Sequence, residues 1–152
     1  MSKIKEKLKE LGYDLPACPA PVAAYLPVQK CGRIIYASGQ TAWVNGELLY
    51  AGKVGGDVSL EEAYESAKLS AINCLSAIDT IADLDHIRIV RVTGFVNAVP
   101  DFGDQPKVVN GASELLEKLF GENGRHARSA IGIGSLPTNA SVEVEIIAEL
   151  ME

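Results

Sequence analysis

The chain has 152 residues, 47% of them hydrophobic and 22% charged, and this composition predicts one globular domain with an ordinary core. It carries 14 lysines and arginines against 20 aspartates and glutamates, so its formal net charge of −6 disfavours binding to nucleic-acid phosphates or to anionic lipid. Its three cysteines, Cys18, Cys31 and Cys74, are widely spaced without a CxxC pair; they indicate neither a disulfide framework nor a metal site and favour reduced thiols in a cytoplasmic protein.

The N-terminal segment is predicted to form a short charged helix, with apolar residues at helical spacing at Ile4, Leu8 and Leu11. A proline-rich linker follows up to Pro21. We therefore divide the chain into an arm with its linker, residues 1–19, and a main domain, residues 20–152. No apolar run in this segment reaches the length of a signal sequence or a membrane span, so we expect the protein to stay in the cytoplasm.

Two strand-like runs come next, at residues 22–29 and 33–38, and Asn45-Gly46 is typical of a hairpin turn. Residues 60–82 place apolar side chains on one face at helical spacing, and Ser59 is a suitable N-cap, so this segment is predicted to be a helix.

The second half of the chain alternates in the same way. We expect strands at 87–99, 127–134 and 142–150, and a helix at 107–121 that Gly121 closes. This order predicts an α+β fold in which two helices pack on one face of a single mixed, mostly antiparallel sheet.

The last two predicted strands raise the question of what Arg128 does. If they pair as a hairpin, the apolar residues of both must share the helix-facing side, which places Ile131 and Ile133 there. The opposite face then carries the arginine, small residues and carboxylates: Arg128, Ala130, Gly132, Gly134, Glu143, Glu145 and Glu149. A face without bulk leaves room for another subunit, a ligand, or both.

Two interpretations of Arg128 remain open at this point. It either pairs with a cross-strand carboxylate such as Glu149, or it serves a site together with Glu143. In the hairpin register Glu143 lies about 13–20 Å further along the sheet. A shared site therefore needs a neighbouring chain or a sharp bend in the sheet.

The sequence ARSxxxxxxLPxxxxVEVExIA, in which Glu143 follows Arg128 by fifteen residues, resembles the C-terminal signature of the Rid family, the YjgF-like reactive intermediate deaminases. Tyr25 stands where this family has the tyrosine of a PYSQ-type segment, and Ser38-Gly39-Gln40 matches its SGQ strand end. Val109-Asn110 matches the VN before the second helix. The resemblance covers residues 20–150, and the N-terminal helix is most similar to the longer subgroup called chorismate-mutase-like.

The resemblance implies a homotrimer whose sheets form a central barrel, with a ligand cleft at each subunit interface. It implies hydrolysis of enamines or imines such as 2-aminoacrylate to a 2-oxo acid and ammonia, without metal or organic cofactor. Arg128 would anchor the carboxylate of a small metabolite, Glu143 would position water, and Tyr25 would orient the reacting group. Ser38, Gly39, Asn110 and Ala130 would line the substrate site.

The chain departs from the family pattern at Leu26 and Pro27, which replace serine and glutamine, and at Ala130, which often is cysteine. A metabolite-binding or regulatory trimer without catalysis is therefore the alternative to a deaminase. Endoribonuclease activity, reported for the family under old names, is disfavoured by the acidic charge.

Four other features have simpler interpretations. The glycine-rich residues 52–57, GKVGGD, lack the GK[ST] ending of a phosphate-binding loop and are interpreted as a flexible loop. Cys74 is expected to be buried in a helix, His126 to lie near the cleft rim or in simple packing, and Trp43 to anchor a loop or an oligomer contact.

Overall fold

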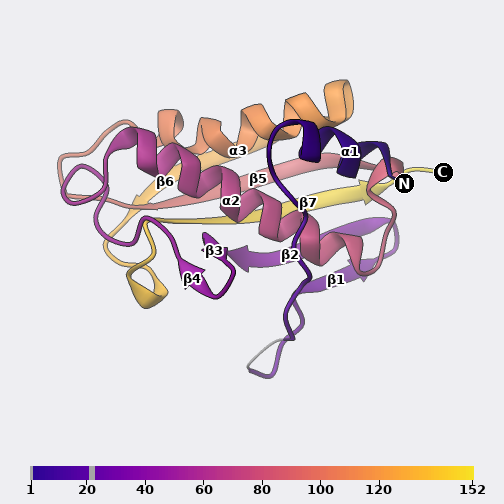
Figure 1. The fold of residues 1–152 in the computed structure, drawn as a ribbon, viewed down its shortest axis with the longest axis horizontal. Helices are drawn as coiled ribbons and strands as arrows, with labels where there is room; N and C mark the ends of the chain where they lie inside the picture. The colour runs from indigo at the N-terminus through magenta and orange to yellow at the C-terminus, as the bar shows by residue number, and fades with distance from the viewer. Residues whose placement is uncertain (1, 21–22) are drawn as a thin grey trace.

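The computed structural model describes residues 2–20 and 23–152, and its main feature is a five-stranded sheet covered on one face by two long helices (Figure 1). The strands follow the order β1-β2-β7-β5-β6, and only the β5–β6 pair is parallel. The sheet strands and the helices have these bounds: α1 Lys3–Glu10, β1 Val28–Cys31, β2 Ile34–Gln40, α2 Leu60–Asp79, β5 Ile87–Asn97, α3 Gln105–Phe120, β6 Ala127–Ile133 and β7 Val142–Leu150. The predicted α+β fold with two helices on one face of a mixed sheet is confirmed.

Local sequence signals explain where several elements begin. The side chain of Ser59 accepts a hydrogen bond from the amide of Glu62, and the Glu62 side chain accepts one from the amide of Ser59 in return, so α2 starts with a capping box. Asn45 and Gly46 adopt positive φ values of 50° and 81° between β3 (Trp43–Val44) and β4 (Glu47–Leu48), as the predicted hairpin requires. No helix of the described residues is long and apolar enough to cross a membrane.

The first sheet strand is shorter than the predicted run 22–29, whose first residue lies outside the described part of the chain. β1 begins only at Val28, directly after Pro27, which has no amide to donate to a neighbouring strand.

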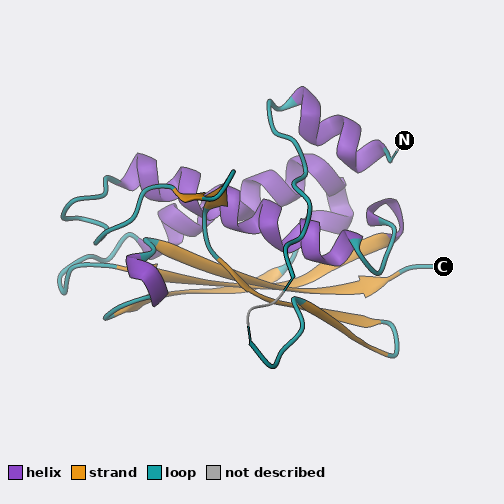
Figure 2. Ribbon diagram, turned by 60° about the horizontal axis from the view of Figure 1, so that its bottom comes forward, coloured by secondary structure: helices purple, strands orange, loops and turns teal. Residues whose placement is uncertain are grey.

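The helix α1 packs outside the helical layer, farthest from the sheet (Figure 2). Its Ile4 and Leu8 are buried, and the carboxylate of Asp85 accepts hydrogen bonds at its N-terminus from Ser2 Oγ at 2.6 Å, from the Lys3 amide at 2.8 Å and from the Ile4 amide at 3.0 Å. The arm is therefore fixed at its start by a side chain from the segment that precedes β5.

The predicted hairpin of the last two strands is wrong. β6 lies at the sheet edge and pairs in parallel with β5, whereas β7 pairs antiparallel with both β5 and β2. The helix α3 supplies the crossover connection that a parallel pair needs, and residues 134–141 then carry the chain past β5 to its other side.

The predicted face of Arg128 is wrong for the same reason. Arg128, Ala130 and Gly132 lie beside Val92, Gly94 and Val96, which face the helices. Ile131 lies beside Phe95 and Glu143 on the uncovered face of the sheet, where it is 43% exposed. Arg128 and Glu143 therefore lie on opposite faces. A charged side chain is tolerated toward the helices because β6 is an edge strand and the start of α3 offers polar partners.

The glycine-rich residues 52–57 are held at several points, which contradicts the expectation of a flexible loop. The amide of Gly52 donates to the carbonyl of Asn139 at 2.8 Å, and the amide of Val54 donates to the carbonyl of Asn97 at 2.8 Å. Val54 is fully buried. Gly55 has φ of 88°, and a Cβ there would lie 2.9 Å from Val99, so only glycine fits this approach.

Candidate functional site

The guanidinium of Arg128 points from β6 toward α3, where it contacts Pro106 in the first turn and Ser113 in the middle of the helix. Its Nη1 donates to Ser113 Oγ at 3.2 Å, and its Nη2 donates to the carbonyl of Pro106 at 3.2 Å. The interpretation that Arg128 pairs with Glu149 is wrong, because Glu149 binds Arg88 at 2.6 Å. Arg128 forms no ion pair with a described residue, so its charge is held in place by neutral oxygens.

Ser113 also connects Arg128 to His126. His126 Nε2 lies 2.8 Å from Ser113 Oγ, and its Nδ1 lies 2.7 Å from the carbonyl of Gly124. Burial and the charge of Arg128 lower the pKa of His126, although the bond to Gly124 opposes them, so the neutral ring is favoured. A neutral ring that donates from Nδ1 to Gly124 must accept at Nε2 from the Ser113 hydroxyl, whose oxygen is then free to accept from Arg128.

Arg128 and Asn110 line one cleft of about 320 Å³ between α3 and the start of β6. Ser113 and His126 line it as well, together with the polar residues Glu114, Glu117 and Arg125. The sequence left two interpretations of His126 open, the cleft rim or simple packing, and it gave no signal for Ser113, which is an isolated serine in a helix. Ala130 follows Arg128 on the same face of β6 and packs half-buried against the core.

The other predicted site residues gather at β2 and β7. Ser38 Oγ donates to the carbonyl of Leu26 at 2.6 Å, and the Ser38 amide donates to the carbonyl of Pro27 at 2.8 Å, so the exposed segment with Tyr25 is tied to β2. A Cβ on Gly39 would lie 2.6 Å from the Glu143 carboxylate. Gly39 therefore lets the Glu143 side chain lie directly against the backbone of β2.

The half-buried carboxyl group of Glu143 keeps its proton up to a higher pH than an exposed glutamate does. Burial raises its pKa, and the nearby charge of Glu145 raises it further. A carboxyl group with a raised pKa can exchange a proton with a bound water nearer to neutral pH than an exposed glutamate can.

The site residues thus form two groups within one chain. The first contains Arg128, Asn110 and Ala130 on the helix-facing side of β6, and the second contains Tyr25, Ser38, Gly39 and Glu143 around β2 and β7. β5 separates the two groups in the sheet, and Arg128 and Glu143 face opposite ways. No cleft that we find in the described residues contains members of both groups.

Cys74 has a structural role, and the described residues form no cluster of metal-binding side chains. Cys74 is fully buried and donates its thiol to the carbonyl of Val144, and burial raises its pKa, as expected for an inert core cysteine. In the described part of the chain no three histidine, cysteine, aspartate or glutamate side chains gather closely enough to hold a metal ion.

Residues 5–150 match a family model described as "YjgF/chorismate_mutase-like, putative endoribonuclease". Protein TCP17 of Trypanosoma cruzi is 36% identical over 151 residues, which are 97% of this chain and 94% of that protein. The 2-iminobutanoate/2-iminopropanoate deaminase of Dermatophagoides farinae is 26% identical over 133 residues, 87% of this chain and 90% of that protein. The crystal structure of Atu1372 from Agrobacterium tumefaciens, 43% identical, covers 97% of this chain and 92% of its own with a TM-score of 0.92.

Proposed function

The chain belongs to the YjgF/chorismate mutase-like family, and on this premise we propose that it hydrolyses reactive 2-imino acids and their enamines to a 2-oxo acid and ammonia. The observation that carries the proposal is the guanidinium of Arg128, which is fixed by Ser113 and Pro106, has no carboxylate partner among the described residues, and lines a cleft with Asn110. The relative from Dermatophagoides farinae is named as a deaminase of this substrate class.

Arg128 is suited to anchor the substrate carboxylate. A guanidinium has five N–H donors, and the bonds to Ser113 and Pro106 use two of them. The remaining three can bind a carboxylate at two points, which fixes both its position and its plane. Asn110 then offers an amide to the rest of the substrate from the same cleft.

The chemical step needs water at the carbon of the C=N bond. In the proposed mechanism water adds to the protonated imine as Glu143 accepts one of its protons, which gives a neutral carbinolamine. Glu143 then returns this proton to the nitrogen. Ammonia leaves as the C=O bond forms, the hydroxyl proton passes to the Glu143 carboxylate, and transfer of that proton to the ammonia restores the ionised glutamate. Its pKa, raised by burial and by Glu145, suits this exchange. The hydroxyl of Tyr25 orients the nitrogen. Neither step requires a metal or an organic cofactor.

The proposed active unit is a homotrimer, because the two groups of site residues cannot meet within one chain. The edge strand β6 of one subunit would bring Arg128 to the Glu143 group of the next. The uncovered sheet face would form a central barrel, which accounts for its exposed Tyr36 and Ile131.

The departures at Leu26, Pro27 and Ala130 favour one alternative, a trimer that binds small carboxylates without turning them over. The family description also contains the word endoribonuclease, but a net charge of −6 disfavours RNA binding. The two leading hypotheses differ in one measurable respect, namely turnover.

The test is a coupled assay in which a dehydratase generates 2-aminoacrylate and the release of pyruvate is followed. We expect wild-type protein to accelerate this release. Arg128→Ala should lower kcat/KM about 100-fold or more, because it removes charge-assisted hydrogen bonds. Arg128→Lys should restore only a small part, because an ammonium cannot bind a carboxylate at two planar points.

Arg125→Ala is the matched control, since Arg125 lines the same cleft but lies near Glu122, at 3.7 Å. It should cost far less than Arg128→Ala. If the wild-type protein assembles correctly and binds pyruvate in calorimetry but does not accelerate pyruvate release, the deaminase hypothesis is rejected in favour of a trimer that only binds small carboxylates. Undiminished activity and pyruvate binding in Arg128→Ala would remove the anchor role altogether.

A further inference from the structure

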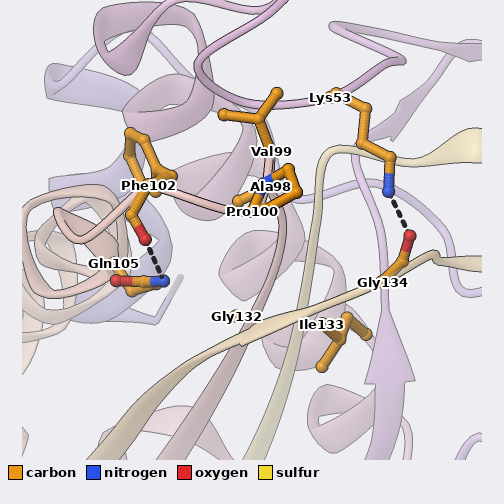
Figure 3. A pocket seen from close by; sticks show the side chains of 9 residues that line it. All are labelled: Lys53, Ala98, Val99, Pro100, Phe102, Gln105, Gly132, Ile133 and Gly134. Atoms are coloured by element: carbon orange, nitrogen blue, oxygen red, sulfur yellow. Dashed lines mark hydrogen bonds between the residues drawn. The ribbon is translucent and has the colours of Figure 1, made fainter.

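A second cleft, of about 510 Å³, lies at the far end of β6 from Arg128 (Figure 3). Its walls are the apolar side chains of Val99, Pro100 and Phe102, whereas the side chain of Ile133 points to the other side of β6. Its floor is formed at Gly132, which has no side chain, and the amide of Gln105 lies directly against this part of β6, since a Cβ on Gly132 would lie 2.7 Å from Gln105 Nε2. This cleft shares no lining residue with the cleft of Arg128.

Lys53 and Gln105 supply the polar groups of this cleft. Figure 3 shows the Lys53 amine directed at the carbonyl of Gly134, to which it donates a hydrogen bond. Gln105 Nε2 donates to the carbonyl of Phe102 at 2.9 Å on the opposite side. An ammonium has three donors and an amide nitrogen two, so these bonds leave two donors on Lys53 and one on Gln105.

The charge of Lys53 is not neutralised by any described carboxylate. Lys53 forms no ion pair within 4 Å among these residues, and none of the nine residues that line the cleft is acidic. Lys53 is also held at a fixed place, because Gly52 and Val54 on either side of it bond to Asn139 and Asn97.

We propose that this cleft is a second binding site, which takes a small carboxylate with a short apolar chain. The carboxylate binds the free donors of Lys53, and the chain lies against Val99, Pro100 and Phe102. The same combination of one cation and apolar walls disfavours amines and gives little affinity for short, strongly hydrated anions. This inference does not depend on the proposed deaminase activity.

The experiment is a titration of the assembled protein with acetate, butyrate and hexanoate at constant ionic strength. Calorimetry measures the affinity, and amide chemical shifts in NMR spectra show where the ligand binds. We expect the affinity to rise about two- to fourfold with each CH₂ group, because each is transferred from water to an apolar wall. Hexylamine, which has a similar chain and the opposite charge, should not bind there. The shifts should concentrate at residues 132–134 and at Val99.

Two variants test the assignment. Lys53→Met should weaken hexanoate binding at least tenfold, and Lys107→Met, which removes an exposed lysine of α3 beside Asp104, should leave it unchanged. Gly132→Val should weaken binding while the charge stays, because its side chain displaces the Gln105 amide, which lies 2.7 Å from the position of a Cβ there, into the cleft. Because both positions are at the surface, retained folding can be checked by thermal melting.

Arg128→Ala separates the two clefts. Hexanoate binding that survives Arg128→Ala and is lost in Lys53→Met supports the second site. Binding that is lost in Arg128→Ala and retained in Lys53→Met would place the ligand in the other cleft and overturn the proposal. Absence of saturable binding to the wild-type assembly, or affinities that do not change with chain length, would overturn it as well.

Discussion

Glu143 illustrates, at the scale of a single residue, how position controls chemistry. It is half-buried on the uncovered sheet face, its carboxylate lies against Gly39, and Glu145 follows on the same face of β7. Burial and the charge of Glu145 both raise its pKa. The proposed proton exchange requires the ionised form of Glu143, so its activity must fall as pH decreases through that raised pKa.

The pH dependence of kcat/KM tests this role. We expect an acid limb whose midpoint lies above the ordinary pKa of glutamate, about 4.3. Glu145→Gln removes a negative neighbour, so it should lower the pKa of Glu143 and move the acid limb to lower pH. The pKa should stay above that of an exposed glutamate, because the burial of Glu143 remains. Glu143→Gln should abolish most activity. An acid limb that does not move in Glu145→Gln would contradict the assignment of this limb to Glu143.

At the scale of an element, α1 is held by a contact that no local signal in its own sequence predicts. Partial burial alone would raise the pKa of Asp85, but the hydrogen bonds from Ser2, Ile4 and Lys3 hold it at about 2. The ordinary value is about 3.9, so the ionised carboxylate stabilises the folded state above about pH 4 and loses this effect as pH falls toward 2. Within one chain, the described residues of the arm line neither of the two clefts along β6.

Asp85→Asn should therefore lower the Tm at pH 7, by about 2–4 °C, because a charged N-terminal cap is lost. The difference between wild type and variant should shrink between about pH 4 and pH 2. Asp101→Asn, at an exposed turn, serves as the control and should melt like wild type. A difference that stays constant down to pH 2 would show that the carboxylate charge is not what stabilises the arm.

At the scale of the whole molecule, the sheet has two faces with different surroundings. The helices cover one face, and the other exposes large side chains, with Tyr36 at 46% and Ile131 at 43% of their surface. A mostly antiparallel sheet can leave one face to water, but large apolar side chains exposed on that face are typical of an interaction surface. The proposed trimer would cover it and would join the Arg128 and Glu143 groups at the same time.

Light scattering at micromolar concentration should give three times the chain mass of 16.2 kDa. Ile131→Asp should dissociate the assembly and abolish deaminase activity together. Ile81→Asp is the matched control, because Ile81 is 45% exposed but follows α2 at the other side of the molecule. A monomeric wild-type protein that retains activity would rule out the shared site.

Much of the fold could be predicted because its signals are local. The capping box at Ser59, the Asn45-Gly46 turn and the alternation in residues 142–150 each act over a few neighbouring residues, and all three elements form as expected. The buried face of β7 is also the predicted one, since Val142, Val144, Ile146 and Ala148 are fully buried. Of the site, the resemblance to the family implied Arg128, Glu143 and Asn110 together, and among the described residues of one chain Arg128 and Asn110 line one cleft without Glu143.

Strand order and the contacts between distant segments were decided only by the tertiary structure. Alternation determines which residues of a strand share a face, but it does not determine which strand lies beside it or which face turns to the helices. For β6, the neighbouring strand and the face that turns to the helices both depended on α3. This helix carries the chain across to the edge of the sheet and offers Ser113 and Pro106 to Arg128. Likewise Lys53 meets Gly134 across 81 residues, because the backbone bonds of Gly52 and Val54 fix its loop beside β6. Such contacts depend on packing between elements, and no pattern within one element encodes them.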